Sequence, residues 1–207
     1  MDFWSFVNSR WDKIFALTIE HGVLILTAMA AAIVVGVVVG VLITYYNPAA
    51  HAVLYICQIL MTVPSLAMLG LLIPLLGIGF WTGVVGLILY SLLPIVRNTY
   101  TGIREIDPAI LEAARGMGMN ERTILLKIKL PLALPVIMAG IRTATVMVVG
   151  IGAIASYVGA GGLGEFIFRG ISRYNKDMIL TGAICVSVLA IAADLILKLV
   201  EKKASFR

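Results

Sequence analysis

Long runs of apolar residues restrict the fold of this chain more than any other feature. Hydrophobic residues make up 61% of its 207 residues and charged residues only 13%, whereas a soluble domain carries about 25% charged residues. A transmembrane helix needs about 20 mostly apolar residues. Because backbone polar groups in lipid must bond within their own segment, helices are expected. The sequence predicts one all-α integral membrane domain over residues 1–207, with five transmembrane helices at about 17–44, 52–76, 80–96, 132–154 and 179–200.

Two longer polar segments, residues 97–131 and 155–178, flank the fourth predicted span. Lys and Arg are enriched in cytoplasmic loops of membrane proteins. If residues 97–131 lie inside, six basic residues of that segment and four near the C-terminus, including Arg207, lie inside against five outside. The sequence therefore predicts an N-terminus outside and a C-terminus inside, and we interpret the net charge of +5 as a topology signal rather than a nucleic-acid surface.

The predicted inner segment has the local signals of a helix–turn–helix. Asp107 and Pro108 suit the N-cap and the first position of a helix. Gly116 and Gly118 can end that helix, because glycine readily adopts the left-handed conformation there. Asn120 can cap a second helix, which leads to Pro131 at the entry of the fourth span.

The spacing within this segment is specific: Glu-Ala-Ala, three residues, Gly, nine residues, then Ile-x-Leu-Pro. It resembles the cytoplasmic coupling loop, or EAA loop, through which ABC import permeases bind their ATPase. The plain alternative is a surface helix–turn–helix that only joins two spans, but the complete pattern at this position favours coupling. The coupling residues that the resemblance implies are Glu112, Ala113, Ala114, Gly116, Gly118, Ile128, Leu130 and Pro131.

A wider stretch, residues 90–170, resembles the permease subunits of osmoprotectant ABC importers, which take up glycine betaine, carnitine or choline. The resemblance is carried by residues 92–102, 131–135, 140–144 and 158–164 in addition to the coupling loop. It implies the type I ABC importer permease fold in a bacterial cytoplasmic membrane. It also implies three partners: ATPase subunits, a second permease subunit in a homo- or heterodimer, and a separate extracellular binding protein.

The same resemblance implies that the chain is a transport subunit and not an enzyme. It binds no cofactor, and ATP and Mg²⁺ belong to the partner ATPase. In agreement, the sequence contains no phosphate-binding Gly-x-x-x-x-Gly-Lys-Ser/Thr loop. Three alternatives remain: a permease of the same class for methionine or another small organic solute, an ion-coupled secondary transporter, which would show internal repeats, and a membrane scaffold.

Two charged residues fall within predicted spans, Arg142 in the fourth and Asp194 in the fifth. Charges at membrane depth are costly, so they usually face the bundle interior or a partner. Both lie at a similar predicted depth near the inner boundary. Three interpretations are open: an Arg142–Asp194 ion pair, separate snorkelling to the interface, or a direct role in the translocation path.

Residues of a translocation path are suggested at two places. The proline within residues 52–76 frees a backbone carbonyl near polar side chains, and the Gly-rich segment 155–178 predicts a tight turn followed by a short helix with an apolar face, supported by Glu165 and Arg169. The candidate path and gate residues are Gln58, Thr62, Pro64, Ser65, Gly159, Gly161, Gly162 and Gly164.

Other polar and aromatic residues point to no further site. His21 and Glu20 are expected at the membrane interface, and their surroundings give no metal-binding pattern. A quaternary ammonium group is normally held by aromatic faces, yet no obvious aromatic cluster lies within the predicted spans. The sequence thus predicts weak solute contacts here, with affinity supplied by the binding protein.

Overall fold

Every element of regular structure in the described part of the chain is a helix. The computed structural model describes residues 3–205, so Arg207 lies outside the described residues. The α-helices are α1 (Phe3–Ser9), α2 (Trp11–Leu42), α3 (Asn47–Thr62), α4 (Ser65–Leu76), α5 (Phe80–Arg104), α6 (Pro108–Gly116), α7 (Glu121–Ile124), α8 (Leu130–Ala155), α9 (Gly164–Ser172) and α10 (Lys176–Ser205). Two 3₁₀ turns, η1 (Ile43–Tyr45) and η3 (Ser156–Val158), and a π-helical turn, η2 (Leu125–Lys129), connect them.

Four stretches of helix in the described chain are long and apolar enough to cross a membrane: Trp11–Tyr45, Phe80–Arg104, Glu121–Val158 and Lys176–Lys202. The helices α3 and α4 are bent by 102° relative to each other. They provide a fifth crossing only if the bent pair counts as one span. The span predicted at residues 52–76, which contains Pro64, is therefore divided into two helices. The cause is local: Val63 is extended, with φ −64° and ψ 130°, as expected of a residue that precedes a proline.

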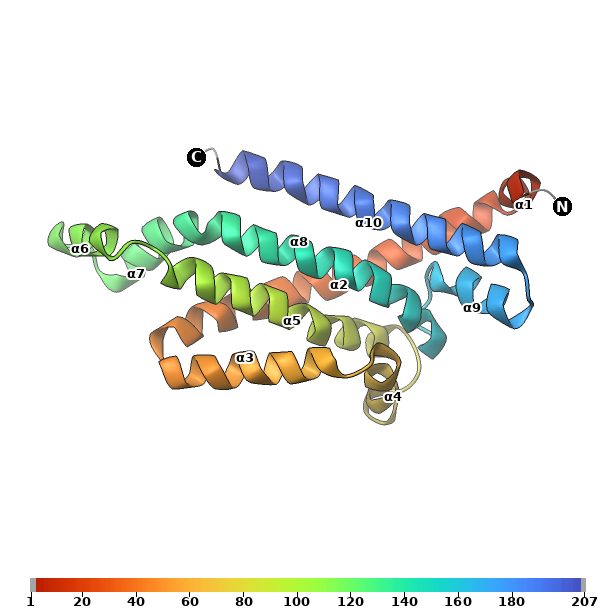
Figure 1. Cartoon of the computed structure of the whole chain (residues 1–207), viewed down its shortest axis with the longest axis horizontal. Helices are drawn as coiled ribbons and strands as arrows, with labels where there is room; N and C mark the ends of the chain where they lie inside the picture. The colour runs from red at the N-terminus through yellow and green to blue at the C-terminus, as the bar shows by residue number, and fades with distance from the viewer. Residues whose placement is uncertain (1–2, 206–207) are drawn as a thin grey trace.

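The helix α5 lies at the centre of the bundle. It packs against α2, α3, α4 and α8, and Leu87 and Ile95 on it are completely buried. The helix α10 instead runs along one edge, against α8 and α9 (Figure 1). The first, third and fourth predicted spans therefore form the packed core of the molecule, while the fifth is the least buried of the four long apolar helices.

The close approach of α2 and α5 depends on Gly36 and Gly40. A Cβ atom on Gly40 would lie 2.5 Å from the Cβ of Thr99, and one on Gly36 would lie 2.7 Å from Cγ2 of Ile95. Small residues four apart allow membrane helices to pack this closely. The sequence interpretation did not identify this contact, although the Gly-x-x-x-Gly spacing within an apolar run was a usable signal.

The two polar segments lie at opposite ends of the bundle. One end carries α6 and α7, together with the C-terminal end of α10 and the turn between α2 and α3 (Figure 1). The other end carries α1, α4 and α9 (Figure 1). We refer to them as the α6 end and the α9 end.

Candidate functional site

The α6 end is built from two capped helices, as the sequence predicts. The side chain of Asp107 accepts a hydrogen bond from the backbone N–H of Ala109 at 2.9 Å, and Asn120 Oδ1 accepts one from the N–H of Thr123 at 2.9 Å. Gly118 has a φ of +79°, which allows the sharp turn between the two helices. Gly116 differs from Gly118 because it is the last residue of α6 itself.

The second helix of this segment is continuous with the following span. From α7, the chain passes through the π-helical turn η2 directly into α8 without leaving helical geometry. Pro131 lies in the first turn of α8, directly after the π-helical turn. The second half of the coupling segment, α7 and η2, is therefore a helical extension of α8 rather than a separate element that ends at Pro131.

Exposure separates the predicted coupling residues into two groups. Glu112, Ala113, Gly116, Gly118 and Pro131 are exposed on the α6 end, whereas Ala114 is completely buried and Ile128 and Leu130 are half-buried. A partner can contact the first group directly. The small side chain of Ala114 instead allows α6 to lie against the rest of the chain.

One acidic residue joins the two helices of the coupling segment. Glu121 Oε1 lies 3.0 Å from Nε of Arg115 on α6, and Glu121 Oε2 lies 3.8 Å from Nζ of Lys129. Glu121 also lies in the first turn of α7, where a negative charge is favoured by the helix dipole. Its pairing with Arg115 follows from the turn at Gly118, which folds α7 back beside α6.

The two predicted intramembrane charges form an ion pair. Arg142 on α8 donates to Oδ1 of Asp194 on α10 from both Nε, at 3.0 Å, and Nη2, at 2.9 Å. Its Nη1 donates to Oε2 of Glu201 at 2.9 Å. The sequence interpretation missed Glu201, although it lies about two helical turns after Asp194 and so on the same face of α10.

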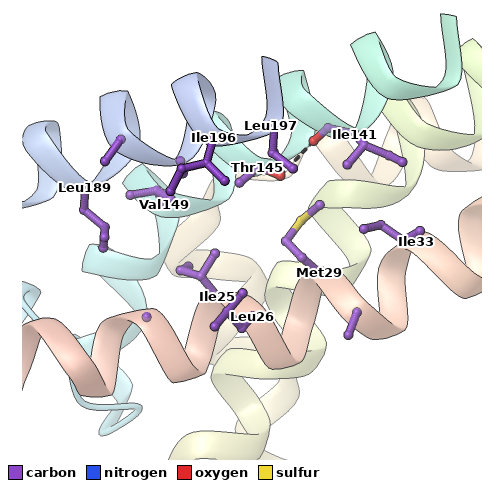
Figure 2. A pocket seen from close by; sticks show the side chains of 14 residues that line it. Ile25, Leu26, Met29, Ile33, Ile141, Thr145, Val149, Leu189, Ile196 and Leu197 are labelled. Atoms are coloured by element: carbon purple, nitrogen blue, oxygen red, sulfur yellow. Dashed lines mark hydrogen bonds between the residues drawn. The ribbon is translucent and has the colours of Figure 1, made fainter. Parts of the chain in front are cut away.

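This charge cluster lies beside an apolar groove between α2, α8 and α10. The groove has a volume of about 490 Å³, and Figure 2 shows Ile25 and Met29 of α2 facing Val149 of α8 and Leu189 of α10 across it. The groove contains little polar surface for a solute to bond to. We therefore regard it as a gap in helix packing and not as part of a solute path.

The Gly-rich segment at the α9 end forms the ordered turn and short helix that the sequence predicts. Gly159, Gly161 and Gly162 have φ values of +79°, +80° and +89°, a region that other residues rarely adopt. Gly164 has no room for a side chain, since a Cβ there would lie 1.9 Å from the carbonyl oxygen of Ala153. Phe166 on α9 is buried, and Arg169 lies 2.8 Å from Glu165.

His21 was expected at the membrane interface, but this expectation is wrong. Its side chain is completely buried, and Nε2 lies 3.0 Å from the carbonyl oxygen of Val149. A Cβ on Gly162 would lie 2.8 Å from Nδ1 of His21, and the N–H of Gly162 donates to Oε2 of Glu20 at 3.3 Å. Two neighbouring residues of α2 therefore hold the Gly-rich turn in place.

Several predicted path residues lie at or near the break between α3 and α4. Tyr90 on α5 donates a hydrogen bond to the carbonyl oxygen of Val63, which the bend has freed. Gln58 accepts a hydrogen bond from Nη2 of Arg97 at 3.4 Å, across α3 and α5. Thr62 bonds only to its own helix, through the carbonyl oxygen of Ile59 at 2.7 Å.

Gln58, Thr62 and Pro64 are exposed on one side of the bundle, and Ser65 is half-exposed. The gate glycines lie at the α9 end, which also carries α4. Among the described residues, no group of three or more His, Cys, Asp or Glu side chains could hold a metal ion.

Comparison with known proteins identifies the class of this molecule. A family model described as binding-protein-dependent transport system inner membrane component matches residues 32–206. The chain belongs to this family: it is a multi-pass membrane permease subunit of an ABC importer.

Relatives of known function agree with this assignment. The chain is 42% identical to the choline transport system permease protein OpuBB of Bacillus subtilis, over 96% of this chain and 91% of the relative. It is 48% identical to the carnitine transport permease protein OpuCD of Listeria monocytogenes, over 83% and 77%. It is 45% identical to the osmoprotectant import permease protein OsmW of Salmonella typhimurium, over 88% and 87%.

The fold is that of a solved importer. The chain is similar to a chain of the MetNI methionine ABC transporter in inward-facing conformations, with a TM-score of 0.82 and 26% sequence identity. The match covers 92% of this chain and 95% of that chain. The predicted type I ABC importer permease fold is thus confirmed.

Proposed function

We propose that this permease subunit translocates small osmoprotectants that carry a quaternary ammonium group, such as glycine betaine, carnitine or choline. The observation that carries the proposal is the identity of 40–48% to permeases named for these solutes, over 83–97% of the chain. The second candidate is methionine, which is favoured only by the similarity to MetNI at 26% identity. Closer relatives point to quaternary amines, so methionine is the weaker candidate.

The geometry of the α6 end supports coupling to a separate ATPase. The exposed residues Glu112, Ala113 and Gly118 form a small-residue surface on which another backbone can lie closely. Because η2 joins this segment to α8 without a break, a displacement of α6 and α7 is transmitted along α8 into the bundle. When the ATPases close on ATP and Mg²⁺, this movement would turn the permease toward its outward-facing state.

The proposed topology places the α6 end in the cytoplasm and the α9 end outside. The N-terminus then lies outside and the C-terminus inside, in agreement with the distribution of Lys and Arg. A second permease subunit would complete the translocation path, because the candidate path residues Gln58, Thr62 and Pro64 are exposed on the surface of one subunit. A separate extracellular binding protein would deliver the solute to the α9 end.

Uptake by a transporter-deficient bacterial strain tests the proposed solute class. We expect expression of the permease with its ATPase and binding protein to restore growth at high salt when glycine betaine or carnitine is supplied. Uptake of radiolabelled betaine should then exceed that of radiolabelled methionine. Methionine uptake without any quaternary amine uptake would contradict the proposal.

A further inference from the structure

We propose that a cavity between η3 and α9 is a weak binding site for zwitterionic quaternary ammonium solutes, which carry both a trimethylammonium group and a carboxylate. The cavity has a volume of about 370 Å³, within the range of roughly 300–1,000 Å³ that is usual for small-molecule sites. The inference rests on the proposed function and narrows its solute class from quaternary amines in general to betaines.

Two aromatic rings form one wall of this cavity. Tyr157 of η3 and Phe168 of α9 both line it, with ring centroids 5.1 Å apart and an angle of 55° between the rings. Tyr157 is 64% exposed, so its ring is accessible from the cavity. A trimethylammonium group carries its positive charge on its methyl surface, and aromatic faces attract such a group.

The sequence interpretation found no such aromatic wall because it searched within the spans. Tyr157 and Phe168 lie instead in the Gly-rich segment, on separate elements. The turn at Gly159, Gly161 and Gly162 reverses the chain between them, so only the folded turn places the two rings together.

The charges beside the rings favour a zwitterion over a simple cation. Oε1 of Glu165 accepts from Lys13 of α2 at 2.9 Å and from Arg169 at 2.8 Å. Glu20 supplies a second carboxylate beside the cavity, where its Oε2 accepts a hydrogen bond from the N–H of Gly162, so the two cations and the two carboxylates balance. Arg169 lines the cavity and its side chain is 52% exposed. Its guanidinium can bind a solute carboxylate, a group that a simple cation lacks.

The position of the cavity suits a site that the solute occupies only briefly. Gly159 and Gly161, two of the predicted gate residues, also line it. The cavity lies at the α9 end, where the binding protein would release its solute. A weak contact there would orient the solute at the gate without holding it.

The test uses the full importer, with its ATPase and binding protein, in proteoliposomes. Initial uptake of radiolabelled glycine betaine and choline is measured for Phe168→Leu and Arg169→Gln. Matched controls are Phe15→Leu, an exposed ring on α2, and Arg173→Gln, an exposed arginine of the same segment that does not line the cavity. Saturation-transfer NMR on the trimethylammonium protons of glycine betaine, without binding protein, reports contact directly.

We expect Phe168→Leu to lower uptake of both solutes about five-fold, the loss that corresponds to one cation–π contact, and to remove the NMR signal. Arg169→Gln should lower betaine uptake by a similar factor and leave choline uptake equal or higher. The controls should match the wild type. Tyr157→Leu is the second variant if Phe168→Leu lowers recovery of the complex.

Two results would overturn the inference while leaving the proposed function intact. One is wild-type uptake with an unchanged betaine-to-choline ratio in Arg169→Gln. The other is an NMR signal that Phe168→Leu does not reduce. A wild-type importer that takes up neither solute would instead overturn the proposed function, and the site with it.

Discussion

A single guanidinium on α8 is shared by two carboxylates of α10. Sequence reasoning identified Arg142 and Asp194 because both interrupt apolar runs, but it left their pairing open. The structure confirms the pair and adds Glu201, so that the three side chains carry a net charge of −1. This arithmetic changes which substitution is most harmful.

We expect Arg142→Gln to damage the protein more than Asp194→Asn. Loss of the guanidinium leaves two carboxylates beside each other, whereas loss of Asp194 leaves Arg142 paired with Glu201. When one partner of a poorly solvated ion pair is removed, the charge of the other partner is no longer compensated, and this destabilises the folded protein. Abundance in isolated membranes should fall several-fold for Arg142→Gln and little for Asp194→Asn. Equal abundance of the two variants would contradict this account of the cluster.

Gly162 of the Gly-rich turn is restricted both in its backbone conformation and in the space for a side chain. Its φ of +89° and the 2.8 Å separation between an added Cβ and Nδ1 of His21 both oppose a side chain. We expect Gly162→Ala to lower the free energy of unfolding by about 2–4 kcal/mol, the sum of backbone strain and overpacking. Thermal unfolding in detergent measures this loss.

The matched control for this prediction is Gly150→Ala on α8. An added Cβ at Gly150 meets no atom within 4 Å, so this substitution should leave the unfolding temperature equal or slightly higher. An unfolding temperature for Gly162→Ala as high as that of the control would show that the turn tolerates a side chain.

At the scale of single elements, local signals in the coupling segment were sufficient to predict where its helices begin and end. Asp107, Asn120 and Gly118 cap or end helices where the sequence predicts, because a cap depends only on a few neighbouring residues. The fusion of α7 to α8 through η2 was not predicted. A π-helical turn has no comparable local signal, and Pro131 was interpreted as a boundary although the first turn of a helix accepts a proline.

The turn at Gly118 gives a direct test of coupling. Valine is β-branched and is strained at a φ of +79°, so Gly118→Val should displace α6 relative to α7. We expect the ATPase to copurify several-fold less well with this variant, while membrane abundance is maintained. Gly70→Ala on α4, where an added Cβ meets nothing within 4 Å, should retain the ATPase. Full retention by Gly118→Val would argue against docking at this turn.

At the scale of the whole molecule, the two polar segments occupy opposite ends of the bundle (Figure 1). This separation suits the proposed function, in which the ATPase would act at the α6 end and the solute would enter at the α9 end. The apolar groove in Figure 2 lies between these ends and is lined by residues of α2, α8 and α10. The charge cluster next to it ties α8 to the otherwise exposed α10.

Cysteine labelling tests the orientation of the molecule. In a background with Cys57 and Cys185 replaced by alanine, we expect a membrane-impermeant maleimide to label Arg173→Cys at the α9 end of intact cells. It should label Met117→Cys at the α6 end only after the membrane is opened. Both positions are exposed in the structure. The reverse pattern would place the coupling segment outside and contradict the proposed function.

The sequence by itself determined the class of fold and the position and local structure of the coupling segment. It also identified Arg142 and Asp194 as charged residues within apolar spans. These features follow from composition and from signals between residues close in the chain. Only the tertiary structure decided the burial of His21, the role of Glu201, and the aromatic wall of Tyr157 and Phe168. Each of these depends on which helices come to lie side by side, and packing between distant segments leaves no local pattern in the sequence.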